Sequence, residues 1–127
     1  MCGPVVFGKN GSVTLIEAIA AGDRDALNEL LADDVVFHSP VQTYRGRDQV
    51  VHLLVTIGGV IDDVEVTREL EGVKFFGASV EEHPVDGVLD EHRDAAGHVS
   101  EITLMLRPLA QLQAAVARMA RALAAPE

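Results

Sequence analysis

Residues 21–41, AGDRDALNELLADDVVFHSPV, are the most informative segment of the sequence. Gly22 followed by Asp23 is typical of a helix end that leads directly into the N-cap of a second helix. Leucines at helical spacing come next and give way to an apolar Val-Val-Phe triplet, which favours a short strand over residues 35–39. Pro40 ends this strand, because proline has no N–H to donate to a neighbouring strand. The stretch therefore predicts a tight helical hairpin that is followed at once by a strand.

On the N-terminal side, the first helix of the hairpin is expected to begin after Ser12, a good N-cap residue. Asp33 and Asp34 are expected to close the second helix. Glycines and a proline punctuate residues 1–11, which we expect to form a flexible N-terminal arm. Because 127 residues suit one hydrophobic core, we expect residues 12–127 to form a single domain.

On the C-terminal side, Asp48 is expected to cap a third helix, which ends at Gly58 and Gly59. Beyond it the apolar residues recur with a period of two, which is typical of strands. The expected strands cover residues 64–70, 73–80, 85–93 and 98–107, and residues 94–97 form the turn of a hairpin.

The strand of residues 98–107 has the clearest alternation. Ile102, Leu104 and Leu106 point to one side, and the residues that alternate with them point to the other: Glu101, Thr103, Met105 and Arg107. The tail, residues 109–125, carries one apolar stripe and is expected to be an amphipathic helix that docks on the rest of the domain. This order of elements predicts an α+β fold, with helices on one face of a curved antiparallel sheet.

The composition excludes several classes of partner. Acidic residues outnumber basic ones by 20 to 10, which gives a net charge of −10 at pH 7, so the surface repels nucleic acids and anionic membranes. No segment approaches the roughly 18 apolar residues of a membrane-spanning helix. The N-terminus has neither a basic leader nor a long apolar stretch, and we therefore expect a cytoplasmic protein.

The sequence lacks the usual patterns of metal and cofactor sites. The five histidines are scattered, and Cys2 is the only cysteine, so no pair has the spacing of zinc ligands. We find no glycine-rich phosphate loop and no Gly-x-Ser-x-Gly elbow. We therefore expect no metal and no cofactor.

Three segments together resemble the nuclear transport factor 2-like superfamily, in the branch of the SnoaL-like polyketide cyclases and ketosteroid isomerases. They are residues 21–41, YRGRDQV at residues 44–50 and DAAGHVSEITLMLRPL at residues 94–109. The resemblance implies a cone-shaped half-barrel, made of a curved mixed or antiparallel sheet, whose helices close over an apolar cavity. It also implies a homodimer. It implies no single activity, because the fold hosts isomerases, cyclases, epoxide hydrolases, dehydratases and non-catalytic binders.

The resemblance also tests one activity directly. Ketosteroid isomerases need a carboxylate base and acids that stabilise a dienolate oxygen, but here the base position holds Ser39 and the first-helix tyrosine position falls at Leu15. Steroid isomerisation by that route is therefore disfavoured. Ser39 either ends the strand or hydrogen-bonds a ligand oxygen at the cavity floor. Tyr44 either donates a hydrogen bond into the cavity or stacks under Arg45 at the surface.

The resemblance places a cavity acid near the strand that enters the last hairpin, where Asp90 and Glu91 lie. If the hairpin is aligned with the family by counting back from Gly97 without a gap, the acid of the family corresponds to Leu89. Glu91, two residues later, then lies on the same face of the strand as Leu89. If the hairpin is one residue shorter, the acid is Asp90. A shift of one residue moves every side chain to the other face, so the two registers stay open. A solvated strand edge is the structural alternative to an acid in the cavity.

Strand alternation puts His38 on the face opposite Ser39. We expect His38 at the surface or at a dimer interface, with a proton shuttle as the alternative. Arg107 is expected to form a salt bridge or a cap that anchors the tail helix. Arg107 is expected to share the dimer-forming face of the sheet with Glu101 and Thr103.

Two functions remain open at this point, and both use a small apolar ligand that bears one or two oxygens. The first is an enzyme of the cyclase, isomerase or hydrolase kind, in which Asp90 or Glu91 is the acid and Ser39 or Tyr44 orients the substrate. The second is a ligand-binding or accessory protein without chemistry. A purely structural dimerisation module is a third possibility, and it predicts a cone filled by side chains. The residues expected to line the cavity are apolar: Leu15, Ile19, Leu27, Leu31, Phe37, Val51, Leu54, Ile102, Leu104 and Leu106.

Overall fold

The computed structural model describes residues 13–124. In this part of the chain four helices accompany one six-stranded sheet with the strand order β2-β1-β6-β5-β4-β3. Neighbouring strands are antiparallel except β1 and β6, which run parallel. The elements in chain order are α1 (Leu15–Ala21), α2 (Arg24–Leu30), β1 (Leu31–His38), β2 (Thr43–Arg45), α3 (Arg47–Val60), β3 (Asp62–Leu70), β4 (Val73–Val80), β5 (His83–Arg93), β6 (Val99–Arg107) and α4 (Leu109–Ala124).

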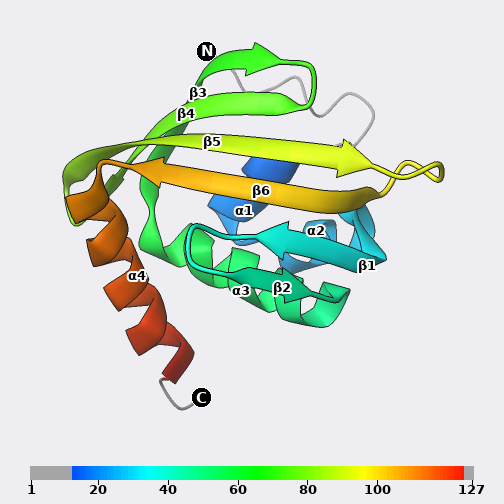
Figure 1. Cartoon of the computed structure of the whole chain (residues 1–127), viewed down its shortest axis with the longest axis horizontal. Coiled ribbons are helices and arrows are strands. Elements are labelled where there is room, and N and C mark those ends of the chain that lie inside the picture. Colours follow the sequence, from blue (N-terminus) through cyan, green and yellow to red (C-terminus); the bar gives the residue numbers. More distant parts are fainter. Residues whose placement is uncertain (1–12, 125–127) are drawn as a thin grey trace.

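The helices α1, α2 and α3 lie on one face of the sheet, and α4 extends away from the end of β6 (Figure 1). The sheet is curved and does not close into a barrel. The α+β prediction is confirmed, with a mixed rather than a purely antiparallel sheet. The predicted helices of the N-terminal half and the amphipathic C-terminal helix are all present.

The helical hairpin forms as predicted, although its boundaries differ. Thr14 caps α1 in a capping box with Glu17, whereas the expected cap, Ser12, lies outside the described residues. Gly22 adopts a left-handed conformation at φ 64° and ends α1, and Asp23 accepts a hydrogen bond from the Ala26 N–H (3.1 Å) and caps α2.

The strand after the hairpin begins earlier than predicted. Asp33 and Asp34 do not close α2, because the helix ends at Leu30 and both aspartates lie within β1. The cause is long-range pairing, since Leu31 already pairs with Val99 of β6. Tertiary pairing of this kind overrides local propensity.

The limits of α3 also correct the sequence prediction. Asp48 lies in the first turn of α3, and the N-cap is Gly46, which makes no side-chain capping bond. The helix continues through Gly58 and Gly59 to Val60. A Cβ atom at Gly58 would overlap the backbone oxygen of Ile19 in α1. Gly58 thus allows two helices to approach closely and does not end a helix.

The hairpin between β5 and β6 has the predicted turn. Gly97 (φ 90°) closes it, with its N–H donating to the Asp94 carbonyl (2.9 Å). The predicted alternation of β6 is confirmed, because Ile102 and Leu104 are buried whereas Met105 is 60% exposed. The strand β2, which has three residues and pairs with the end of β1, was not predicted.

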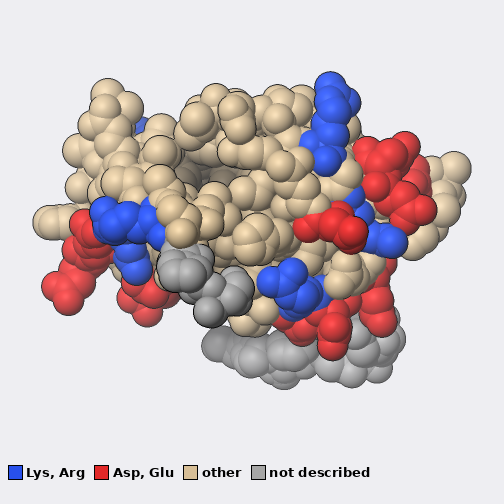
Figure 2. Space-filling model, turned by 90° about the horizontal axis from the view of Figure 1, so that it is seen from below, with Lys and Arg blue, Asp and Glu red and all other residues tan. Residues whose placement is uncertain are grey.

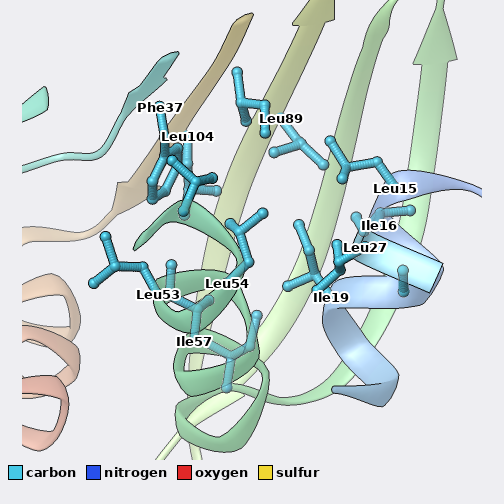
Figure 3. Packing of buried hydrophobic residues seen from close by; sticks show 14 of the residues in the cluster. Leu15, Ile16, Ile19, Leu27, Phe37, Leu53, Leu54, Ile57, Leu89 and Leu104 are labelled. Atoms are coloured by element: carbon cyan, nitrogen blue, oxygen red, sulfur yellow. The ribbon is translucent and has the colours of Figure 1, made fainter. Parts of the chain in front are cut away.

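The core lies between the inner face of the sheet and the three N-terminal helices. Figure 3 shows side chains from α1, α3 and the strands pointing into this shared layer. Leu27, Leu54 and Ile102 are fully buried, and the described part of the chain buries no charged or polar residue. Among the described residues, an apolar space opens at one end of this layer, beside α4.

Candidate functional site

An apolar groove opens between α4, the C-terminal half of α3, the β1–β2 turn and the inner face of β6. Its volume is about 210 Å³. The side chains that line it are aliphatic or aromatic with two hydroxyls: Phe37, Ser39, Pro40, Val41, Tyr44, Leu53, Ile57, Val60, Ile61, Leu104, Leu106, Leu112, Ala115, Val116, Met119, Ala120 and Leu123.

The wall formed by α4 is held by few contacts. Its apolar stripe faces the groove, but Ala115 is the single residue of the described helix that is buried. Arg118 Nη1 donates a hydrogen bond to the carbonyl of Val60 at the end of α3 (3.2 Å). Val116 and Leu123 stay about 40% exposed, so a ligand in the groove would cover apolar surface that is now in water.

The mouth of the groove is uncharged. Figure 2 looks at the molecule from the side of α3 and α4, and it shows a hollow surrounded by residues that are neither acidic nor basic. Charged side chains gather toward the two ends of this face (Figure 2). The described charged side chains visible on this face therefore lie toward its ends rather than around the hollow (Figure 2).

Ser39 lines the groove, but its hydroxyl is engaged by the turn that follows β1. The Oγ donates to the Gln42 carbonyl (2.8 Å) and accepts from the N–H groups of Val41 (3.1 Å) and Gln42 (3.0 Å). These three bonds are the serine form of a turn-stabilising motif. Ser39 therefore has a structural role in the turn and retains little capacity to bind a ligand.

Tyr44 also lines the groove and comes from β2. Its ring stacks on Phe37 with a centroid separation of 6.3 Å and an interplanar angle of 26°. Within residues 13–124 its hydroxyl makes no hydrogen bond to another residue. Of the two open interpretations of Tyr44, stacking under Arg45 is replaced by stacking on Phe37, and the hydroxyl is available to a ligand.

The two acids lie on opposite faces of β5, and neither lines the groove. Asp90 pairs with Thr103 in register, faces outward and contacts His92 (Oδ2 to Nε2, 3.2 Å). Glu91 shares the inner face with Leu89, which is 3% exposed. The strand therefore has the register obtained by counting back from Gly97 without a gap, in which Leu89 and Glu91 share one face.

Glu91 nonetheless lies far along the strand from the groove. Its carboxylate is bound by Arg93 (Oε2 to Nη2, 3.0 Å), and its backbone N–H donates to Gly72 (2.9 Å) at the β3–β4 turn. With only 12% of its side chain exposed, Glu91 is a paired strand-end carboxylate rather than a group in the groove.

The residues expected to line a cavity fall into three sets. Phe37, Leu104 and Leu106 do line the groove. Ile19 and Leu54 line a separate void of about 20 Å³ under α1 and α3. The others are fully buried in the packed core because the helices pack tightly against the sheet there: Leu15, Leu27, Leu31, Val51 and Ile102.

The groove has walls that the sequence did not indicate. Leu112, Val116 and Met119 come from α4, and Val41 comes from the β1–β2 turn. The apolar stripe of residues 109–125 was visible in the sequence, but nothing in a stripe says whether it packs on a core or borders a cavity.

His38 lies on the outer face of the sheet, as strand alternation predicts. Its Nε2 contacts Glu101 (2.7 Å) and its Nδ1 contacts Thr43 Oγ1 (3.0 Å), which joins β1, β6 and β2. Arg107 forms a salt bridge with Asp86 of β5 (3.1 Å), so it links two strands and does not anchor α4. Both side chains of that pair are about 70% exposed, and the pair therefore adds little to stability.

Residues 13–124 contain no cluster of three or more side chains that could ligate a metal ion. None of their helices is long and apolar enough to cross a membrane.

Comparisons with known proteins agree with this geometry. A family model described as the SnoaL-like domain matches residues 13–71. The chain is 33% identical to a steroid delta-isomerase from Pseudomonas aeruginosa, with 84% of each chain covered and a TM-score of 0.79. It is 26% identical to an uncharacterised protein with a cystatin-like fold from Silicibacter pomeroyi (94% of this chain, 92% of the other, TM-score 0.80).

A third structure shares the fold alone. It is a nuclear transport factor 2-like protein of unknown function from Cytophaga hutchinsonii, 12% identical over 73% of this chain and 83% of the other, with a TM-score of 0.60. The comparison with curated proteins finds no match. The fold, the matched domain and the 33% identity over most of both chains lead to one conclusion: this chain belongs to the nuclear transport factor 2-like superfamily and contains its SnoaL-like domain.

Proposed function

We propose that this protein binds a small apolar molecule bearing one or two oxygens in the groove beside α4, and that it does so without acid–base chemistry. The observation that carries the proposal is the lining of the groove. Among residues 13–124, those that line it include no carboxylate, imidazole or amine, and the hydroxyl of Tyr44 is their one uncommitted polar group. A general base must reach the proton that it removes, and the described lining has none.

The role proposed for Tyr44 is to orient the ligand. Its ring is fixed by stacking on Phe37, so the hydroxyl is presented to the groove at small entropic cost. A neutral hydrogen bond of this kind contributes about 0.5–1.5 kcal/mol.

The first experiment identifies the ligand by native mass spectrometry of the purified protein, with 4-butylphenol as a defined probe in equilibrium dialysis. We expect Tyr44→Phe to weaken binding of the probe by about 3- to 10-fold. Thr43→Val is the matched control, because it removes a hydroxyl from the same strand on the opposite face, where Thr43 contacts His38. Equal dissociation constants for wild type and Tyr44→Phe would contradict the orienting role, and no binding by wild type would contradict the proposed function.

The second candidate is a cofactor-independent isomerase or cyclase, and the 33% identity to a steroid delta-isomerase favours it. Glu91 or Asp90 would supply the acid, and the substrate would have to approach a different part of the cone from the groove. The test measures conjugated enone formation from a β,γ-unsaturated cyclic ketone by ultraviolet absorbance. Turnover that falls in Glu91→Gln or Asp90→Asn would support this candidate, and unchanged turnover in both would exclude acid–base catalysis by these residues.

We further propose that the protein is a cytoplasmic homodimer that associates through the outer face of the sheet. Val88 and Met105 are register partners on that face, and Met105 is 60% exposed. Charged residues of both signs, among them Glu101 and Arg107, surround this apolar pair. Such a surface suits a two-fold contact in which each patch meets its own copy.

A further inference from the structure

A second, much smaller void lies deeper in the cone, between α1, α3 and the sheet. It measures about 20 Å³ and its lining is entirely apolar. Ile57, Ile61 and Leu104 line both this void and the groove. A single layer of side chains therefore separates the ligand groove from the deep end of the cone.

The deep end is filled by one ring. Phe76 of β4 is 3% exposed, lines the small void and lies over Gly87 of β5, its partner in register. A Cβ atom at Gly87 would overlap this ring. The absence of a side chain at Gly87 is what allows the ring to lie flat against the sheet at this point.

The same row of the sheet connects the ring to the groove. Gly87 pairs with Phe76 on one side and with Leu106 on the other, and Leu106 lines the groove. The ring of Phe76 thus lies on the inner face, behind the layer of Ile57, Ile61 and Leu104 that the void shares with the groove. Removing the ring would enlarge the void and let this layer move back, which would widen the groove.

The size of the groove indicates what fits in its present form. Pockets for drug-sized ligands measure about 300–1,000 Å³, and an engineered cavity of about 150 Å³ holds benzene. The groove, at about 210 Å³, lies between these. It suits one substituted ring or a short chain and is too small for four fused rings.

We propose that Phe76, lying over Gly87, sets the size limit of the site, so that the ligand is a monocyclic or short-chain apolar molecule and fused polycycles are excluded. This inference rests on the proposed binding function. It makes Phe76 a specificity-determining residue that acts through the volume it fills, although it does not line the groove itself.

The test compares two phenols that differ in size, 4-butylphenol and the four-ring phenol estradiol, by equilibrium dialysis. Wild type is expected to bind 4-butylphenol at least tenfold more tightly than estradiol. Phe76→Ala is expected to raise the affinity for estradiol at least tenfold. Phe75→Ala is the matched control, because Phe75 is the adjacent residue on the opposite face, where its ring lies under Arg68 (4.8 Å), and it is expected to keep the wild-type ratio.

The outcomes separate the two proposals. If wild type binds estradiol as tightly as 4-butylphenol, the binding function stands and the size limit is wrong. An unchanged ratio in Phe76→Ala, or an equal change in Phe75→Ala, also overturns the size limit. If neither wild type nor Phe76→Ala binds either phenol, the binding function fails and the size limit fails with it. Should Phe76→Ala not fold, as judged by its thermal unfolding curve, Phe76→Leu decides the matter, with a smaller gain for estradiol expected.

Discussion

At the scale of single residues, two adjacent glycines in α3 differ in whether a side chain would fit at their position. A Cβ atom at Gly58 would overlap the carbonyl oxygen of Ile19, whereas one at Gly59 would meet nothing within 4 Å. Gly58 is therefore required by the crossing of α1 and α3. Gly59 is an exposed glycine inside the helix. It costs backbone entropy on folding, and no close contact requires a glycine there.

We predict that Gly58→Ala destabilises the protein by about 1–3 kcal/mol, because α3 must move away from α1. Gly59→Ala should stabilise it by about 0.5–1 kcal/mol. Urea denaturation followed by circular dichroism measures both. Equal effects of the two substitutions would show that the helices do not approach each other at Gly58.

At the scale of elements, α4 is the least firmly attached wall of the groove. One of its described residues is buried, and two arginines link it to the body of the domain. Arg118 is half-buried and donates to the Val60 carbonyl at 3.2 Å. Arg121 is exposed and stands 3.9 Å from Glu81.

We predict that Arg118→Met lowers the free energy of unfolding by about 1–2 kcal/mol, since the carbonyl of Val60 loses a charged donor. Arg121→Met, which removes an exposed ion pair from the same helix, should change it by less than about 0.5 kcal/mol. Hydrogen exchange of the α4 amides should rise selectively in Arg118→Met. If the α4 amides exchange at the same rate in Arg118→Met and Arg121→Met, Arg118 does not hold the helix.

The sequence predicts those helices, strands and turns whose signals are local. Helices and strands with strong periodicity were recognised, and so was the turn at Asp94–Gly97, because their signals are local. The start of β1 at Leu31 and the short strand β2 depend on partners far along the chain. Ser39 and Tyr44 both line the groove, but which hydroxyl is free depends on the hydrogen bonds of the turn, and a linear pattern does not encode these.

At the scale of the whole molecule, the two faces of the sheet differ. The inner face is apolar and packed, and the outer face carries paired charges around Val88 and Met105. The dimer proposed on the outer face would bury this apolar pair without covering the groove, which opens on the other side.

We predict that Met105→Glu shifts the protein from dimer to monomer in sedimentation velocity, since two carboxylates would meet at the two-fold axis without partners. Val66→Glu is the control, because Val66 pairs with Phe76 and is 40% exposed away from that patch. A wild-type protein that sediments as a monomer would contradict the proposed dimer.

The parallel pairing of β1 with β6 has a consequence for biosynthesis. About 60 residues separate the end of β1 from the start of β6, and ribosomes add about 5–20 residues per second. For roughly 3–12 seconds of translation, β1 is therefore present with β2 on one edge but without its parallel partner β6 on the other. The centre of the sheet can therefore be completed only after β6 has been made, and we expect β1 to be stabilised fully only at that stage.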